Sequence, residues 1–294
     1  MNERAFVLIG PGNVGLTISS LLQERGFQCK QVVSRIAEGE EEIRRWMGSE
    51  VRIVPWEEWQ PDRTEFVLVA TPDDRIKEIG LQLVVKYQDM NTFPCTFIHF
   101  SGLQSSATFQ PLRDIGFDAA SLHPLQTIPS VEIGRRAILD CIWGVEGDAP
   151  ELCATIIDAL EGKQVPLSGE NKVAYHLAAV FASNLLVALE AIAMDIAAEA
   201  GIAPNKFPEV FSPLIRQTMD NLLSRGPNNA VTGPVKRADS STIQKHLDWL
   251  QTADERYLVI YRELSQYLTE VLLAENNISL QDVEKITQVL DETA

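Results

Sequence analysis

Six residues near the start of the chain have the types and spacing that hold a pyrophosphate: Gly10-Pro11-Gly12-Asn13-Val14-Gly15. In this G-x-G-x-x-G pattern the first glycine allows a sharp turn, the second lets the backbone approach the phosphates, and the third allows close helix packing. An apolar run at residues 5–9 precedes the motif, and a helix-periodic stretch that ends at Gly26 follows it. A helix that begins at this point directs unpaired N–H groups and a positive dipole end toward phosphate. The motif in this context predicts a dinucleotide site; a glycine-rich turn without a ligand is the alternative.

Polar side chains follow three later apolar runs, where parallel strands of such a sheet would end. Thr71-Pro72 and Asp73 come after the first of these runs. A functional role for them is about as well supported as a structural one, in which Pro72 stops the strand and Asp73 caps the next helix. Ser101 follows the second run, within which His99 reads as a packed core histidine. His123 ends the third run before a proline. With an ordinary pKa near 6.5, a histidine there could donate a proton to a carbonyl or imine, or simply be hydrogen-bonded within the fold.

A long apolar helix predicted near residues 171–200 contains a polar stripe. At about 100° per residue, its members fall within about 40° of one another around the axis. They are Lys172, His176, Ser183 and Glu190, whereas Asn184 faces another neighbour. Buried polar groups need partners, so the stripe either lines a solvated cleft or forms hydrogen bonds across a helical interface. In a later loop, Arg237 could bind a substrate carboxylate or be surface charge.

The apolar run at residues 28–33, the first after the glycine motif, predicts which dinucleotide binds. NAD-specific domains place an acid about 20 residues after the glycine motif, where it binds the ribose 2′-hydroxyl. Here that run ends in Ser34-Arg35, a hydroxyl followed by a guanidinium, which suits a 2′-phosphate. NADP is therefore favoured over NAD, although Arg35 could be solvated and Glu38 or Glu40 could complicate this reading.

The elements that must position these residues alternate between strands and helices in the first half of the chain. Strands are expected at residues 5–9, 28–33, 51–54, 66–70, 96–100, 119–122 and 137–145, and helices at 14–25, 38–47, 73–87 and 149–160. Such alternation predicts an α/β fold, a Rossmann doubly wound and mostly parallel sheet.

After residue 168 the strand signals stop. Helices are expected at residues 171–200, 204–223, 240–251, 253–273 and 280–291. We therefore expect a Rossmann NADP-binding domain at 1–168 and an all-helical substrate and dimerisation domain at 169–294. The first of these helices is apolar all round, which predicts burial in the helical domain or in a dimer interface.

Composition limits the class of protein. The formal net charge of −16 argues against nucleic acid or an anionic membrane as the main partner. The four cysteines are widely spaced, which suits a reducing cytoplasm and gives no case for a structural metal. The chain enters its first strand almost at once, so no signal peptide is expected, and polar residues interrupt the longest apolar segment, so no membrane span is expected.

With these residues in view, the chain resembles the 6-phosphogluconate-dehydrogenase-like superfamily, in which a Rossmann domain precedes a helical domain. More closely, it is similar to a bacterial family of candidate oxidoreductases that pairs a Rossmann-like NADP-binding domain with a helical C-terminal domain of unknown function, number 2520. The matching segments are the glycine motif and residues 70–73, 99–102, 121–127, 175–184 and 232–239. The resemblance implies a homodimer that forms through the helical domain.

More distant resemblances concern single residues. His123-Pro124 is similar to the His-Pro of prephenate dehydrogenases, where the histidine assists hydride transfer. Ser34-Arg35 is similar to the NADP-reading turn of pyrroline-carboxylate reductases. Asn184 is similar to the helix asparagine of 3-hydroxyacid dehydrogenases, but their catalytic lysine, one turn earlier, is replaced here by Val180. This departure argues against a hydroxyacid-dehydrogenase mechanism.

We therefore expect an NADP-dependent oxidoreductase that moves a hydride between nicotinamide and a small C=O or C=N substrate. The candidate catalytic residues are His123, His176, Ser183, Asn184 and Lys172, with His123 or His176 as general acid and Arg237 as a substrate clamp. The alternative class is an NADP-binding sensor without turnover. A third possibility, in which a second reduced cofactor such as a deazaflavin passes hydride to NADP, predicts another large, aromatic-lined cavity.

Overall fold

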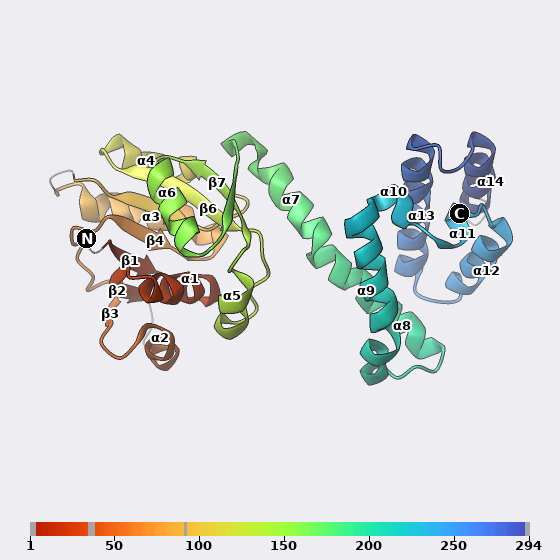
Figure 1. The fold of residues 1–294 in the computed structure, drawn as a ribbon, viewed down its shortest axis with the longest axis horizontal. Coiled ribbons are helices and arrows are strands. Elements are labelled where there is room, and N and C mark those ends of the chain that lie inside the picture. Colours follow the sequence, from red (N-terminus) through yellow and green to blue (C-terminus); the bar gives the residue numbers. More distant parts are fainter. Residues whose placement is uncertain (1–3, 35–38, 91–92, 292–294) are drawn as a thin grey trace. The chain divides into compact units, whose positions relative to one another are not determined.

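The chain forms two compact units. The computed structural model describes residues 4–34, 39–90 and 93–291. The units are Met1–Asn184 and Leu185–Ala294 (Figure 1). The helical part of the sequence starts near residue 169 as predicted, but its first helix belongs to the first compact unit.

An eight-stranded sheet forms the centre of the first unit. Its strands are β1 (Ala5–Ile9), β2 (Gln28–Ser34), β3 (Arg52–Pro55), β4 (Phe66–Val69), β5 (Thr96–His99), β6 (Asp118–Pro124), β7 (Ile142–Gly147) and β8 (Lys163–Pro166). The strand order is β3-β2-β1-β4-β5-β6-β7-β8. Strands β1 to β6 are parallel, β7 is antiparallel to β6, and β8 is parallel to β7. The order reverses between β1 and β4, which is where open sheets of this kind bind ligands.

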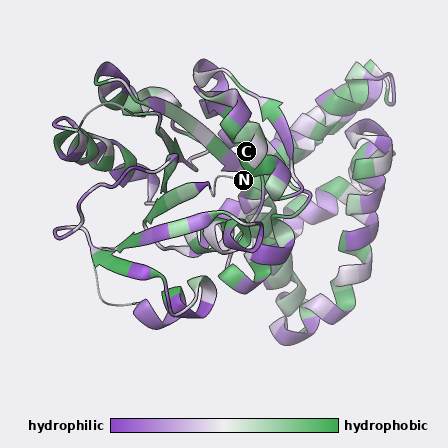
Figure 2. Ribbon diagram, turned by 60° about the vertical axis from the view of Figure 1, so that its left-hand side comes forward, coloured by the Kyte–Doolittle hydropathy of each residue, from purple (hydrophilic) through white to green (hydrophobic). Residues whose placement is uncertain are grey.

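Helices cover both faces of this sheet, so its central strands are buried throughout. Every residue of β4 and β5 is buried, as parallel strands with two covered faces require. Successive residues point to opposite faces, and Leu8 and Leu68 belong to one apolar core whereas Val7 and Val69 belong to the other. Figure 2 shows hydrophobic residues along the strands. The predicted doubly wound, mostly parallel sheet is confirmed.

Seven helices and two short 3₁₀ turns are described in the first unit. They are α1 (Asn13–Glu24), α2 (Glu40–Met47), α3 (Asp73–Tyr87), η1 (Ser106–Phe109), α4 (Gln110–Asp114), α5 (Val131–Ala137), α6 (Pro150–Ala159), η2 (Gly169–Asn171) and α7 (Lys172–Ala182). The strand predicted at 137–145 is wrong in its first half, since β7 starts at Ile142. Helix α5 comes before it, and the Ser130 side chain accepts a hydrogen bond from the Ile133 N–H at its N-terminus. Strand β8 has no continuous apolar run and was not predicted.

The second unit is helical, as predicted. Its elements are α8 (Asn184–Glu199, which begins at the last residue of the first unit), η3 (Pro204–Lys206), α9 (Phe207–Arg225), α10 (Pro227–Ala230), α11 (Gly233–Lys236), α12 (Ser240–Leu250), α13 (Glu255–Ala274) and α14 (Leu280–Asp291). Ile243 and Leu247 of α12, Leu272 of α13 and Ile286 of α14 form its buried core.

The predicted long helix is divided and exposed. Ser183, with φ −129° and ψ −72°, separates α7 from α8, so the polar stripe does not continue in register to Glu190. Apolar side chains of α7 are solvent-exposed, with Val173 at 62%, Leu177 at 52% and Phe181 at 63%. Burial of this segment in the helical domain or in a dimer interface therefore stays a prediction.

The same segment bears on the expectation that no segment spans a membrane, which stays a prediction. Among the described residues, only Gly169–Glu199, which includes α7 and α8, is long and apolar enough to span a membrane, with a mean hydropathy of 2.0 in an 18-residue window. Length and composition alone support that reading, and core helices of soluble proteins meet the same criteria.

Candidate functional site

A cavity of about 340 Å³ lies at the carboxyl ends of β1, β2 and β4. Its walls come from the glycine loop, the strand ends and the first turns of α3. They include Ile9, Gly10, Pro11, Gly12, Val33, Ser34, Trp56, Ala70, Thr71, Pro72, Arg75 and Ile79. The Thr71 hydroxyl is buried and has no hydrogen-bond partner among the described residues. A mainly apolar cavity with a few polar groups, at the point where the strand order reverses, suits a nucleoside.

Gly10 and Gly15 have the predicted structural roles, and Gly12 leaves space for the predicted approach of a phosphate. Gly10 has φ +85°, and a Cβ there would lie 2.9 Å from the Ala70 carbonyl oxygen. At Gly15 a Cβ would lie 2.6 Å from the Gly10 carbonyl oxygen, so this position allows only glycine at such close packing. Gly12 has no atom within 4 Å of its hypothetical Cβ, so its backbone faces open space. No side chain among the described residues caps α1, and its first turn has no acid, which leaves its N–H groups for phosphate. These residues fit a dinucleotide.

Other predicted cofactor residues lie elsewhere. The Asn13 amide donates to the Pro129 carbonyl at 2.8 Å and so links α1 to the loop before α5. Val14 packs against the core at partial burial. The Ser101 hydroxyl donates to Asp73 at 2.7 Å and accepts from the Gln104 N–H, so it stabilises its own loop. Arg35 lies outside the described residues.

Lys172 is buried at the carboxyl ends of β5 and β6. Its side chain is 0% exposed, and its Nζ donates to the Ser101 carbonyl at 2.7 Å and to the Ser121 hydroxyl. The Ser121 hydroxyl in turn donates to the same carbonyl at 3.2 Å. Burial lowers the pKa of Lys172 from 10.5 to about 8, while Glu146 and Asp73 oppose this shift. An ammonium with this pKa is mostly protonated at pH 7 and can lose its proton near neutral pH.

His123 and His176 form a histidine pair beside Gly102. Their ring centroids are 6.2 Å apart, and a Cβ at Gly102 would lie 2.8 Å from both His123 Nε2 and His176 Nδ1. A glycine at this position therefore leaves the space that both imidazoles need. His123 Nδ1 is 3.0 Å from the Tyr175 hydroxyl, whereas His176 Nδ1 is buried without a hydrogen-bond partner among the described residues.

The protonation states of these groups follow from burial and from the lysine. Burial, followed by the charges of Lys172 and His176, lowers the pKa of His123 to about 4. Burial raises the pKa of Tyr175. At pH 7 His123 and Tyr175 are therefore neutral, so His123 can form a hydrogen bond but carries no charge. His99 is a buried core residue, as predicted, and burial lowers its pKa to about 3.

Asp73 connects the cavity with the lysine. It follows the cavity residues Thr71 and Pro72 and accepts the hydrogen bond of the Ser101 hydroxyl at 2.7 Å. The Ser101 carbonyl then accepts from Lys172 at 2.7 Å. The nucleotide cavity and the group with the altered pKa therefore lie on adjoining loops of the same sheet edge.

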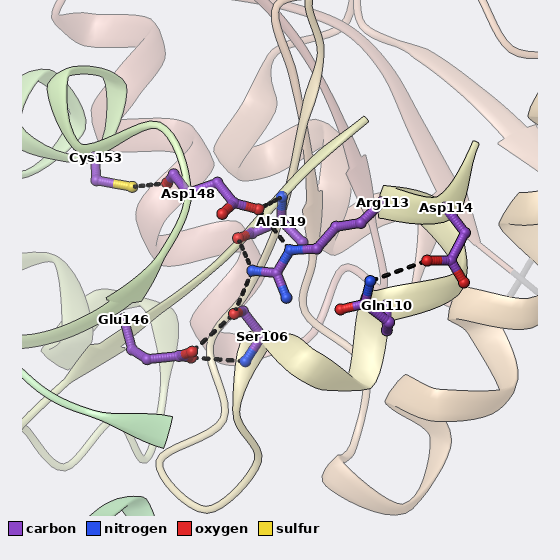
Figure 3. A network of polar contacts seen from close by, with 8 residues as sticks. All are labelled: Ser106, Gln110, Arg113, Asp114, Ala119, Glu146, Asp148 and Cys153. Atoms are coloured by element: carbon purple, nitrogen blue, oxygen red, sulfur yellow. Dashed lines mark hydrogen bonds and ion pairs between the residues drawn. The ribbon is translucent and has the colours of Figure 1, made fainter. Parts of the chain in front are cut away.

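A second polar network supports this edge from β7 (Figure 3). Glu146 accepts from the Ser106 backbone N–H at 2.6 Å and from its hydroxyl at 2.8 Å. Arg113 bridges Asp148 at 2.6 Å and the Ser106 hydroxyl at 2.7 Å. These bonds fix the turn η1, which follows the Ser101 loop. They also hold the Glu146 carboxylate, whose negative charge partly offsets the lowering of the Lys172 pKa by burial.

The remaining predicted site residues are not brought to this cluster by any described hydrogen bond. Ser183 and Asn184 lie at the junction of α7 and α8, roughly 10 Å further along the helix than His176 at 1.5 Å per residue. Arg237 is exposed at the end of α11 in the second unit.

Sequence reasoning missed Tyr175, Trp56, Arg75 and Glu146. Tyr175 had a usable signal, because it lies three residues after Lys172 and so shares a helix face with it. The sequence signal for Arg75 was weaker: it lies in the first turn of the helix that follows the strand-end residues 71 and 72.

The sheet order and the glycine loop define a Rossmann-like fold, and the residues of the cavity fit a dinucleotide. Residues 141–268 match the family model of a domain of unknown function, DUF2520. This match confirms the predicted resemblance. A search of curated proteins finds no match.

Solved structures share the fold over nearly the whole chain. A candidate NADP oxidoreductase from Bacteroides fragilis is 22% identical, with a TM-score of 0.70, and the match covers 91% of this chain and 98% of that one. A protein from Thermotoga maritima is 25% identical with a TM-score of 0.70, over 92% and 99% of the two chains. A 1-pyrroline-5-carboxylate reductase from Streptococcus pyogenes is 13% identical with a TM-score of 0.57, over 98% and 100%.

Proposed function

We propose that this protein is an NADP-dependent oxidoreductase that transfers a hydride between nicotinamide and a small C=O or C=N substrate. The observation that supports this most is the connection through Asp73 and Ser101, which joins the nucleotide cavity to the buried Lys172. Similar structures described as an NADP oxidoreductase and a pyrroline-carboxylate reductase are consistent with this class. Neither defines a substrate.

The residues of the first unit suggest how such a reaction is assisted. When bound, the nicotinamide supplies or accepts the hydride. Gly12 and the first turn of α1 would hold the pyrophosphate, and Ser34 would contact the adenosine half. His123, neutral and held by Tyr175, would orient the substrate oxygen or nitrogen by a hydrogen bond. The charge of Lys172 acts on His123, so the ammonium would stabilise negative charge on a substrate held by His123 and would make a proton available near pH 8.

Turnover distinguishes this proposal from the sensor alternative. We expect His123→Asn to lower kcat for NADPH-dependent reduction by about tenfold, since one neutral hydrogen bond contributes about 0.5–1.5 kcal/mol. NADPH affinity should stay within about twofold, because His123 does not line the nucleotide cavity. The measurement is NADPH oxidation by the wild type in a screen of keto acids and cyclic imines, repeated with the variant. NADPH binding without turnover of any such substrate would favour the sensor.

We also propose a homodimer in which a second copy covers the exposed apolar side chains of α7. Val173, Leu177 and Phe181 recur every four residues and so form one stripe along the helix. Contiguous exposed apolar surface on a protein marks an interaction site. The N-terminal turn of α7 is anchored at the sheet edge through Lys172, which argues for a protein partner over a lipid bilayer.

A charge at the C-terminal end of the stripe tests the dimer. We expect Phe181→Glu to convert a dimer to a monomer in analytical ultracentrifugation, because an unpaired carboxylate in an apolar interface costs several kcal/mol, about 2–5. The matched control is Val85→Glu on α3, which is 65% exposed compared with 63% for Phe181. A wild-type monomer that floats with phosphatidylcholine vesicles would contradict the proposal and favour membrane contact.

The second unit has an apolar cavity of about 550 Å³ between α8, α12 and α13. Trp249, Tyr257 and Tyr261 contribute to its walls. A second reduced cofactor, such as a deazaflavin, predicts a large, aromatic-lined cavity, and this cavity has such a size and lining. Hydride transfer also requires contact with the nicotinamide, so this possibility stays a prediction.

A further inference from the structure

The nucleotide cavity has one charged residue among the described residues of its wall. Glycine, proline and apolar side chains make up most of the lining, and Ser34, Thr71 and Arg75 supply the polar side chains apart from the Trp56 indole. Arg75 is the charged one. A protein with a formal net charge of −16 repels anions on average, so a cation inside an anion-binding cavity has a specific use.

Arg75 and Ser34 reach this cavity from different elements. Ser34 is the last residue of β2, and its carbonyl accepts the backbone N–H of Trp56 at 2.9 Å, which extends the ladder beyond the β2–β3 pairing. Arg75 occupies the first turn of α3, where its backbone N–H donates to the Pro72 carbonyl at 2.9 Å. A hydroxyl at the end of β2 and a guanidinium from α3 therefore face one ligand space.

The guanidinium retains donors for a ligand. Its NH1 pairs with Glu78 at 3.2 Å, and both side chains are 43% exposed. Glu78 also accepts a hydrogen bond from the Gln82 amide at 3.0 Å. An exposed ion pair of this kind is weak, and a guanidinium has five N–H donors, so a phosphate can be bound without breaking a strong interaction. The Glu78 contact holds the side chain at the cavity wall.

We propose that Arg75 binds the 2′-phosphate of NADP and is thereby a specificity-determining residue that favours NADP over NAD. This inference rests on the proposed function, since it concerns the same cofactor. A guanidinium forms charge-assisted, bidentate hydrogen bonds to phosphate, whereas a ribose 2′-hydroxyl offers no charge for it to pair with. Arg75 therefore contributes to NADP affinity and little to NAD affinity.

Calorimetric titration of Arg75→Gln with NADPH and with NADH tests this assignment. We expect the NADPH Kd to rise at least about tenfold and the NADH Kd to change by less than about twofold, as expected for loss of a charge-assisted bond to phosphate. The control Lys77→Gln removes an exposed cation from the same helix outside the cavity wall, and it should leave both Kd values within about twofold.

The outcomes separate the inference from the proposed function. Equal weakening of NADPH and NADH by Arg75→Gln would show a general adenosine contact and overturn the assignment, as would an unchanged NADPH Kd. A similar loss of NADPH affinity in Lys77→Gln would show that any cation of α3 acts through long-range charge, and this would also overturn the assignment. A wild type that binds neither nucleotide would instead contradict the proposed function. Binding of 2′-AMP that weakens in Arg75→Gln, with 5′-AMP unaffected, would support the phosphate contact without any catalytic assay.

Discussion

Lys172→Met should lower kcat for NADPH-dependent reduction by about 10²- to 10⁴-fold, the range that a positioned acid or base contributes. The methionine removes both the positive charge that acts on His123 and the proton with a pKa of about 8. The fold should persist, because the Ser121 hydroxyl still donates to the Ser101 carbonyl at 3.2 Å. NADPH affinity should also persist, since Lys172 is not part of the cavity wall. Steady-state kinetics with thermal unfolding as a check measure this result.

The pH dependence of the wild type gives the same test without a substitution. The pKa of Lys172 is lowered from 10.5 to about 8, so the group is an ammonium below pH 8 and an amine above it. If the ammonium assists reduction, kcat should fall as pH rises through about 8, and the reverse oxidation should gain over the same range. The Lys172→Met variant should lose this inflection, whereas Lys163→Met, at an exposed lysine of β8, should keep it. A wild-type profile that is flat between pH 7 and 9 would contradict the assigned role.

Gly12→Ala should weaken NADPH binding by at least about 30-fold while leaving the fold intact. Its Cβ would meet no atom within 4 Å, and its φ of −80° suits any residue, so the substitution causes no strain. The methyl group would instead occupy the space that a pyrophosphate needs against the backbone. Calorimetric titration and a thermal unfolding midpoint within about 2 °C of the wild type are the two measurements, since a surface change of this kind is worth under about 0.5 kcal/mol.

Gly15→Ala provides the contrast. A Cβ there would lie 2.6 Å from the Gly10 carbonyl oxygen and 2.9 Å from the Ala70 Cβ, so α1 must shift from β1. We expect a clear loss of stability together with the loss of binding. Unchanged NADPH affinity in Gly12→Ala would mean that the phosphate does not approach this backbone.

Local rules predicted the elements that hold the nucleotide. The strand at Ala5–Ile9 and the helix at Asp73–Tyr87 have the predicted bounds, because a glycine turn and a proline punctuate them. The rules failed near residue 137, where a short apolar run ends a helix and Asp140 turns with φ +60° before β7 begins. Short edge strands such as β8 depend on a neighbouring strand for their backbone pairing, and no local pattern shows this.

The sequence indicated which residues could do chemistry but not how they interact. Lys172 and His176 were predicted to line one stripe of a continuous helix, whereas the break at Ser183 limits that stripe to the first turns of α7. The lowered pKa of His123 results from burial and from two charges distant in sequence, so its neutral state at pH 7 could not be predicted. The contact between Tyr175 and His123 becomes apparent only when β6 and α7 are placed together.

Calorimetric titration of the purified protein with NADPH, NADH and their oxidised forms tests the central claim most directly. The structure leads us to expect micromolar binding of one nucleotide per chain, with NADPH bound more tightly than NADH. Absence of binding by every nicotinamide nucleotide would contradict the assignment and would mean that this fold has another use in this protein.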